Sequence, residues 1–218
     1  MRDRSESSSK SSRPPLTNTT DLHTFLRTRR SIRRFKPEPV PDSVIREILH
    51  TATFAPSAHN RQPWRFVVLN KHHEIIQFAD RMAVEFKHVL EKDNLPPEEI
   101  QKRLLRSKER ITGAPVVILL CVEMTEMEKY PDEHRQRAEY LIATQSGANA
   151  GMQLLLAAHA EGLGGVWVCS PLFAQNAVKE ELKLPETWEP HAMFLIGYPV
   201  EIPTARERKN LEEVVLFR

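Results

Sequence analysis

Five arginines fall within residues 27–34, in the segment RTRRSIRR, and a serine lies among them. Such a run is typical of a solvated basic turn or of a weak nucleic-acid contact. Arginine also donates paired hydrogen bonds to phosphate, and a neighbouring hydroxyl adds another donor. The stretch Arg29 to Phe35 is therefore a candidate site for a phosphate monoester, and the basic-turn interpretation stands beside it.

A second basic segment lies near the carboxyl end of the chain. Gly197-Tyr-Pro199 is followed by Arg206, Arg208 and Lys209. On its own this pattern indicates an exposed basic turn. Together with the first segment, however, it provides a second set of cations for a single phosphate.

The segment PSAHNRQPW, residues 56–64, is polar and lies between an expected helix and an expected strand. Its side chains could simply satisfy local backbone groups, as in many turns. Amide side chains also offer both donors and acceptors, which suits the mixed edge of a flavin pyrimidine ring. Because ligand-binding groups often sit on such loops, Ser57, Asn60 and Gln62 are candidate ligand contacts, whereas His59 fits an ordinary surface position.

A glycine-rich segment, GLGGVWVCS, spans residues 162–170. It fails as a dinucleotide fingerprint, because the last glycine is missing and the segment precedes a strand instead of following one. Glycines do let the main chain approach a flat ligand, so the amides of Cys169 and Ser170 could face one. No adjacent base would activate Cys169 as a nucleophile, and we expect it to be a buried thiol.

Other chemistries find no support in the sequence. Two cysteines without a CxxC spacing and nine histidines without HExxH argue against a disulfide framework and a metal site. GxSxG and GxxxxGK[ST] patterns are absent. A net charge of +2 gives no reason to expect nucleic acid as a bulk partner. The longest apolar run, Ala114 to Val122, is too short for a membrane helix, and we expect a cytoplasmic protein in a reducing compartment.

The elements that must position these groups follow from periodicity. Residues 1–20 are rich in serine, proline and charge and are expected to form a disordered tail, so that one domain spans residues 21–218. We predict a short helix capped by Asp21, a helix capped by Asp42 and ended by Pro56, a long amphipathic helix around residues 75–90, and a charged helix ending near residue 111. Strands are predicted at residues 64–69 and 116–122.

The second half of the chain opens with a long helix, from about Glu133 to Glu161. Gly147 and Gly151 lie one turn apart on it and would permit close approach of another backbone. Strands at 166–168, 191–196 and 214–217 and a helix at 174–181 complete the pattern. Helices and strands interleave without a regular βαβ repeat, which favours an α+β fold.

Taken together, the segments RRSIRRF, APSAHNRQPWRFVVL, GLGGVWV and GYP followed by RxR resemble the nitroreductase family across residues 21–218. Within that family, LPETWEP at residues 184–190 followed by an apolar strand is similar to the FMN-binding domain fused to the deazaflavin-coenzyme γ-glutamyl ligase, although the ligase half is absent. The resemblance implies a mostly antiparallel sheet flanked by helices. It also implies an intertwined homodimer that binds FMN at its interface through residues of both chains.

The same resemblance implies roles for individual residues. Arg29, Ser31, Arg206 and Arg208 would surround the FMN phosphate, with Arg30 in the same loop. Arg33 would lie near the flavin pyrimidine; Ser57, Asn60 and Gln62 would contact the ring or ribityl chain; and the amides of Cys169 and Ser170 would face the reactive edge of the ring. His59 and Arg61 depart from relatives at the mouth of the pocket, and the role of Ser146 is open.

The leading functional hypothesis is an FMN-dependent oxidoreductase that moves hydride from NAD(P)H to a small acceptor by a ping-pong mechanism. The acceptor could be a nitroaromatic, a quinone, an enone or a deazaflavin-like molecule. The flavin carries the chemistry, and Arg33 would stabilise the anionic reduced form. The alternatives are a flavin-fragmenting benzimidazole synthase of the same fold and a non-catalytic flavin- or nucleic-acid-binding module.

Overall fold

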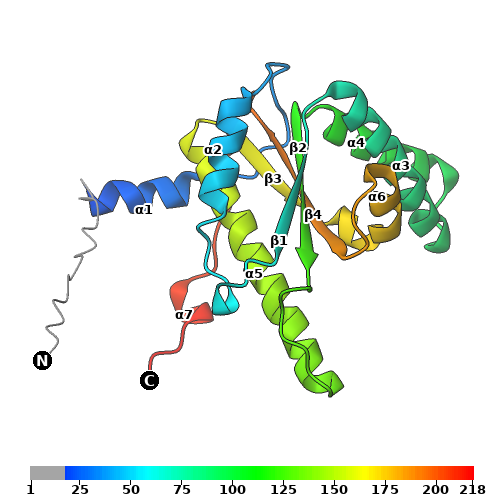
Figure 1. Cartoon of the computed structure of the whole chain (residues 1–218). Helices are drawn as coiled ribbons and strands as arrows, with labels where there is room; N and C mark the ends of the chain where they lie inside the picture. Colours follow the sequence, from blue (N-terminus) through cyan, green and yellow to red (C-terminus); the bar gives the residue numbers. More distant parts are fainter. Residues whose placement is uncertain (1–17) are drawn as a thin grey trace, which may run out of the picture.

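The computed structural model describes residues 18–218, so most of the predicted tail, residues 1–17, lies outside the described residues. A four-stranded sheet in the order β1-β2-β4-β3 forms the centre of the molecule, with helices on both faces (Figure 1). All three strand pairings are antiparallel. The predicted α+β class is therefore confirmed.

The strands are β1 (Trp64–Leu69), β2 (Val116–Glu123), β3 (Gly164–Val168) and β4 (Trp188–Gly197). β2 and β4 occupy the centre, and seven consecutive residues of β2 are buried, as expected for a strand covered on both faces. β4 begins three residues earlier than predicted because its first residues pair with the end of β2. Its register shifts between Leu120 and Cys121, which leaves His191 as the extra residue of a β-bulge.

One face of the sheet is covered by α2 (Asp42–Ala52) and α5 (Glu133–Ala160). The glycines of α5 meet side chains and not the backbone that we predicted. A Cβ on Gly151 would lie 2.7 Å from the ring of Phe194 and would also overlap Trp167, and one on Gly147 would lie 3.2 Å from Val122. The absence of side chains there lets the aromatic residues of β3 and β4 fill the space against the helix.

The opposite face is covered by α3 (His72–Lys92), α4 (Pro97–Thr112) and α6 (Gln175–Leu182). Phe78 of α3 is fully buried against the sheet and anchors this second half of the core. Two single-turn helices, η1 (Ala58–Asn60) and η2 (Ser170–Phe173), follow α2 and β3 in the chain. No helix within residues 18–218 combines the length and apolar character that a membrane span requires.

The helix ends differ in detail from the predictions. α1 (Thr19–Thr28) is capped by Asn18, whose side chain accepts a hydrogen bond from the amide of Thr20 at 2.9 Å, and Asp21 lies inside its first turn. Pro41, not Asp42, precedes α2, which ends at Ala52 before reaching Pro56. No residue of α1 is buried within this chain. Figure 1 shows α1 projecting away from the sheet.

The predicted final strand at residues 214–217 is wrong. A capping box between Asn210 and Glu213 starts a short helix, α7 (Leu211–Val214), and the residues after it follow an irregular path. Every residue from 200 to 218 is exposed, although Leu216 and Phe217 are large and apolar. Within residues 18–218 they pair with no strand, so alternating apolar residues alone did not make a strand. Residues 199–218 are called the carboxyl-terminal arm below.

Candidate functional site

The two basic segments of the sequence come together at the β3 edge of the sheet. Ser31 forms a parallel bridge with Gly165, and the amide of Ile32 donates to the carbonyl of Gly165 at 3.0 Å. Phe35 forms an antiparallel bridge with Pro199, and the amide of Val200 donates to the carbonyl of Arg34 at 3.2 Å. These backbone contacts bring the carboxyl-terminal arm against the first arginine segment.

Both segments line one pocket of about 310 Å³, which we call the arginine pocket. Its cationic and hydroxyl groups come from two regions of the chain more than 160 residues apart, and they are Arg29, Arg30, Ser31, Arg33, Arg34, Thr204, Arg206 and Arg208. The only carboxylate on its wall, Glu201, lies 3.5 Å from Arg34.

The electrostatics of the arginine pocket favour an anion. Burial lowers the pKa of Arg29, and the neighbouring charges of Arg208 and Arg30 lower it further. Among the ion pairs formed within residues 18–218, none involves Arg29, Arg30, Arg206 or Arg208. Like charges held together without a carboxylate repel one another, and a phosphate placed among them would relieve that repulsion.

A second group of like charges adjoins the pocket and was missed by the sequence analysis. Burial lowers the pKa of Arg110 at the end of α4, and the charges of Arg33 and Arg106 add to the effect. Arg33 thus connects the arginine pocket to α4. In the sequence Arg110 is one of several charges on a highly charged helix, and nothing in that pattern distinguishes it from a solvated residue.

The predicted contact loop has an unusual backbone. His59, Asn60 and Gln62 have φ values of 50°, 53° and 51°, in the left-handed region that non-glycine residues rarely adopt. Ser57 Oγ accepts a hydrogen bond from the amide of Gln62 at 3.1 Å. Gln62 Nε2 lies 3.3 Å from Asn60 Oδ1. Backbone strain of this kind persists only where surrounding contacts hold it, and it concentrates at ligand sites.

Helix α5 supplies contacts that hold this loop. Ser146 Oγ accepts from the amide of Ala58 at 3.3 Å while donating to the carbonyl of Ile142 at 2.9 Å. Asn149 Nδ2 donates to the carbonyl of Pro56 at 3.2 Å. Ser146 therefore holds the loop through a hydrogen bond from α5. This contact gives a structural role to a residue whose function the sequence left open.

Arg61 fixes the other side of the loop through an ion pair with Glu128. Its Nε atom is buried and has no hydrogen-bond partner within residues 18–218. Loop 57–62 contributes no residue to the wall of the arginine pocket. Within one chain, therefore, the structure joins Arg29, Arg30, Ser31, Arg33, Arg206 and Arg208, and it places Ser57, Asn60 and Gln62 elsewhere.

The glycine-rich segment forms β3 and the turn after it. Cys169 is exposed, so its predicted burial is wrong. It follows the last residue of an edge strand, where the chain turns into η2, and its Sγ lies 3.1 Å from the indole nitrogen of Trp167. Ser170, half-buried, begins η2. Cys121, inside β2, is the buried cysteine, and burial raises its pKa to about 12.

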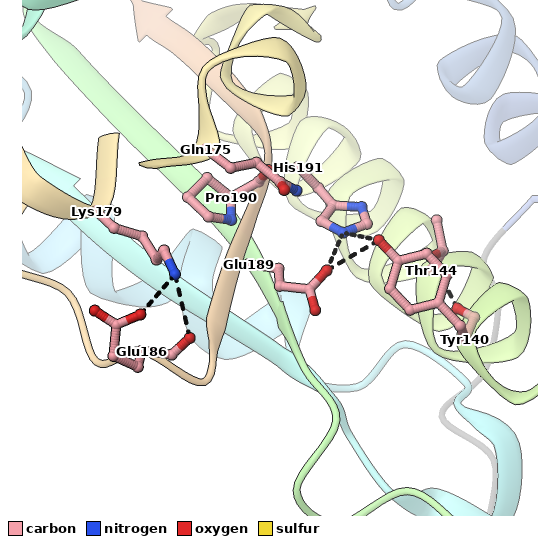
Figure 2. A network of polar contacts seen from close by, with 8 residues as sticks. All are labelled: Tyr140, Thr144, Gln175, Lys179, Glu186, Glu189, Pro190 and His191. Atoms are coloured by element: carbon pink, nitrogen blue, oxygen red, sulfur yellow. Dashed lines mark hydrogen bonds and ion pairs between the residues drawn. The ribbon is translucent and has the colours of Figure 1, made fainter. Parts of the chain in front are cut away.

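A second polar cluster lies between α5 and β4, where the bulge brings His191 to the α5 side (Figure 2). Tyr140 donates to Glu189 at 3.0 Å and lies 3.2 Å from His191 Nε2. Burial raises the pKa of Tyr140 to about 12, aided by Glu189. Burial lowers the pKa of His191 despite the opposing influence of Glu189. None of these three residues lines the arginine pocket, so we assign the cluster to the structure of the fold.

The described part of the chain holds no group of three or more histidine, cysteine, aspartate or glutamate side chains that could bind a metal ion.

Comparisons of this chain with known proteins agree with one another on the kind of protein that it resembles. A candidate NAD(P)H nitroreductase of Bacillus subtilis is 28% identical over 192 residues, which cover 88% of this chain and 91% of the relative. An NADH dehydrogenase of Thermus thermophilus is 30% identical over 226 aligned residues, covering 91% of this chain and 96% of the relative.

Solved structures show the same similarity. A candidate nitroreductase of Desulfovibrio desulfuricans, solved in complex with FMN, superimposes with a TM-score of 0.68 at 26% identity, over 90% of this chain and 96% of the other. The family model described as "Nitroreductase family" matches residues 26–198 of this chain. This range includes the first arginine segment, the strained loop and the whole sheet. The protein therefore belongs to the nitroreductase family.

Proposed function

We propose that this protein is an FMN-dependent oxidoreductase that passes electrons from NAD(P)H to a small organic acceptor by a ping-pong mechanism. The observation that carries the proposal is the arginine pocket, in which two distant segments gather Arg29, Arg30, Arg206 and Arg208, none of which forms an ion pair within residues 18–218. Relatives named as NAD(P)H nitroreductases and NADH dehydrogenases, and a similar structure with FMN bound, support the same assignment.

The donor set of the arginine pocket fits a phosphate monoester. Arg29, Arg206 and Arg208 supply charged donors and Ser31 supplies a hydroxyl. Most of the residues that line the pocket are charged or polar, which suits the phosphate end of the cofactor and not its flat ring. β3 and the main chain at Cys169 and Ser170, where the backbone turns away from the sheet, would hold the ring.

When bound, FMN accepts hydride from NAD(P)H and passes two electrons to the acceptor. The chain itself supplies binding and electrostatics. Arg33, with the positive charge of Arg110 nearby, would lie beside the pyrimidine end and would stabilise the negative charge that reduction creates there. The main chain at Cys169 and Ser170 would orient the reactive edge of the ring.

We also propose that the site is completed by a second copy of the chain. Loop 57–62 carries strained backbone and two amide side chains but lies outside the arginine pocket of its own chain. The carboxyl-terminal arm and α5 expose large apolar residues, including Leu141, Met152 and Phe217. Exposed apolar surface of this kind marks an interface. In a homodimer the loop of one protomer reaches the ring held by the arginines of its partner.

The acceptor is a nitroaromatic, quinone, enone or deazaflavin-like molecule. The likeness of residues 184–190 to the FMN-binding domain fused to the deazaflavin-coenzyme ligase supports an unsaturated deazaflavin precursor among them. No residue of the chain need bond covalently to any of these acceptors, because the cofactor carries the electrons.

The first test compares FMN with riboflavin, which lacks the phosphate. The purified protein should be yellow, bind FMN more tightly than riboflavin and lose its flavin absorbance on addition of NADH or NADPH without oxygen. Arg208→Ala should weaken FMN binding about tenfold or more, because a charge-assisted hydrogen bond to phosphate is lost. Riboflavin binding should stay unchanged.

Lys209→Ala is the matched control, since it removes one neighbouring cation that does not line the arginine pocket. It should leave FMN affinity close to that of the unmodified protein. Equal losses in Arg208→Ala and Lys209→Ala would indicate a diffuse charge effect and contradict the phosphate site. A protein that binds neither flavin would refute the proposed function as a whole.

A further inference from the structure

A second pocket, of about 350 Å³, lies between α3 and η2, and we call it the α3–η2 pocket. Met82, Phe86 and Val89 of α3 form one wall, and Phe173 and Ala174 form the other. Met82 and Ala174 are buried, whereas the side chain of Phe173 is 79% exposed at the rim. A volume of this size falls within the range of small-molecule pockets.

Most of the pocket wall that a ligand would meet is apolar. Its one ionisable wall residue is Glu85, whose carboxylate lies 2.9 Å from Arg81 Nη1. Arg81 also contacts Glu180 of α6 at 3.1 Å. Arg81 thus faces two carboxylates and offsets only part of the negative charge of Glu85. The remaining surface of the pocket is mostly apolar and favours an uncharged apolar group.

The α3–η2 pocket adjoins the proposed cofactor site through Ser170, which lines it. Ser170 is also where the proposed function places the reactive edge of the ring. A molecule with its redox-active head at the ring could therefore extend a substituent into this pocket. Polar acceptors would gain nothing from these walls, whereas an apolar substituent would leave water as it enters.

We propose that the α3–η2 pocket binds an apolar substituent of the electron acceptor, and that quinones carrying an alkyl chain are the favoured acceptors. This inference rests on the proposed function. In the overall reaction, NAD(P)H, one proton and the quinone give NAD(P)⁺ and the hydroquinone. NAD(P)H loses a hydride, and the quinone gains two electrons and two protons, the second proton coming from solvent.

The test uses 1,4-benzoquinones that carry one methyl, propyl or pentyl group. These alkyl groups have nearly the same electronic effect on the ring, so differences report on binding of the chain. The measurement is kcat/KM for each quinone at saturating NADPH or NADH, together with the rate of flavin reduction in the absence of quinone. We expect kcat/KM to rise with chain length, by up to about fourfold for each methylene that becomes buried.

Two variants of one helix provide the matched comparison. Val89 and Val84 both lie on α3 and are 45% and 46% exposed, but only Val89 lines the pocket. Val89→Asp places a charge at the pocket wall and should flatten the dependence on chain length. Val84→Asp adds the same charge outside the pocket and should keep the dependence of the unmodified protein.

The possible outcomes separate this inference from the proposed function. Normal flavin reduction with kcat/KM independent of chain length would overturn the inference alone. Equal flattening in Val84→Asp and Val89→Asp would overturn it too, because the effect would then be one of surface charge. A protein that shows no flavin reduction by either nucleotide would refute the proposed function, and the inference would fall with it.

Discussion

Several arginines lie close enough together that their positive charges repel one another. Arg29 lies near Arg30 and Arg208, and Arg110 lies near Arg33. Gathering cations without carboxylates costs stability, which a folded protein tolerates where an anionic ligand offsets the cost. The arginines that concern the proposed chemistry are therefore recognised because they form no ion pair with a carboxylate in the described part of the chain.

Arg33 gives the prediction that belongs to this scale. Replacing it with alanine should lower the two-electron reduction potential of bound FMN by about 30 mV, because positive charge beside the reduced cofactor is lost. The potential can be measured by equilibration with a reference dye in the FMN-loaded protein. Lys209→Ala serves as control, since Lys209 is an exposed cation that does not line the arginine pocket. An unchanged potential in a folded, FMN-loaded Arg33→Ala protein would count against the role.

At the residue scale the sequence predicted six of the residues that line the arginine pocket, but it did not predict Arg34, Glu201 or Thr204. Arg29, Ser31, Arg206 and Arg208 could be proposed because serine among arginines has a recognisable chemistry. Arg110 could not be proposed, because its proximity to Arg33 depends on which face of α4 packs toward Arg33. The exposure of Cys169 was also missed, because an apolar neighbourhood in sequence does not reveal the end of an edge strand.

Among the elements, α5 connects the most parts of the molecule. It packs on the sheet, supports the strained loop through Ser146 and Asn149, and contacts the bulge of β4 through Tyr140. Periodicity predicted its length almost to the residue. What periodicity could not give is the partner of Gly151, which is a pair of aromatic side chains on β3 and β4. The bulge at His191 likewise depends on pairing between distant strands.

The Tyr140–Glu189–His191 cluster predicts how stability depends on pH. Burial lowers the pKa of His191 below its value in the unfolded chain, about 6.5, so the folded protein binds fewer protons. The free energy of unfolding should therefore fall as pH drops through about 6.5, by at most about 1.4 kcal/mol per pH unit from this histidine. Denaturant unfolding at pH 8, 7, 6 and 5.5 measures that slope.

His191→Gln should reduce the slope without abolishing it. Burial also lowers the pKa of His159, with Arg29 and Arg30 contributing, so this second histidine still responds to acid. His88→Gln, a change at an exposed position of α3, is the control and should leave the slope as it is. If both variants showed the slope of the unmodified protein, the assignment to His191 would be incorrect.

At the scale of the whole molecule, two segments of the described chain bury little of their surface. α1 projects from the sheet with no buried residue, and the carboxyl-terminal arm is exposed along its length (Figure 1). The sequence pattern at residues 214–217 indicated a strand because it reports apolar alternation and not the presence of a partner. The overall α+β class was predictable from the order of elements, whereas the sequence did not show what α1 and the carboxyl-terminal arm contact, and we propose that they contact a second chain.

Mixed dimers test the central claim most directly. One variant, Arg29→Ala with Arg208→Ala, loses the phosphate contacts, and another, Asn60→Ala with Gln62→Ala, loses the loop contacts. If arginines of one protomer and the loop of its partner form each site, every mixed dimer regains one intact site, although each variant alone is impaired. Differently tagged copies, co-expressed and purified through both tags, isolate that species.

The measurement is FMN bound per mixed dimer, with NAD(P)H-dependent bleaching as a second readout. The account predicts about one tightly bound, reducible FMN per mixed dimer, against little tight binding in either parent variant. Binding as weak as in both parents would mean that arginines and loop serve the same site from one chain, or that they serve no common site, and either result would contradict the account.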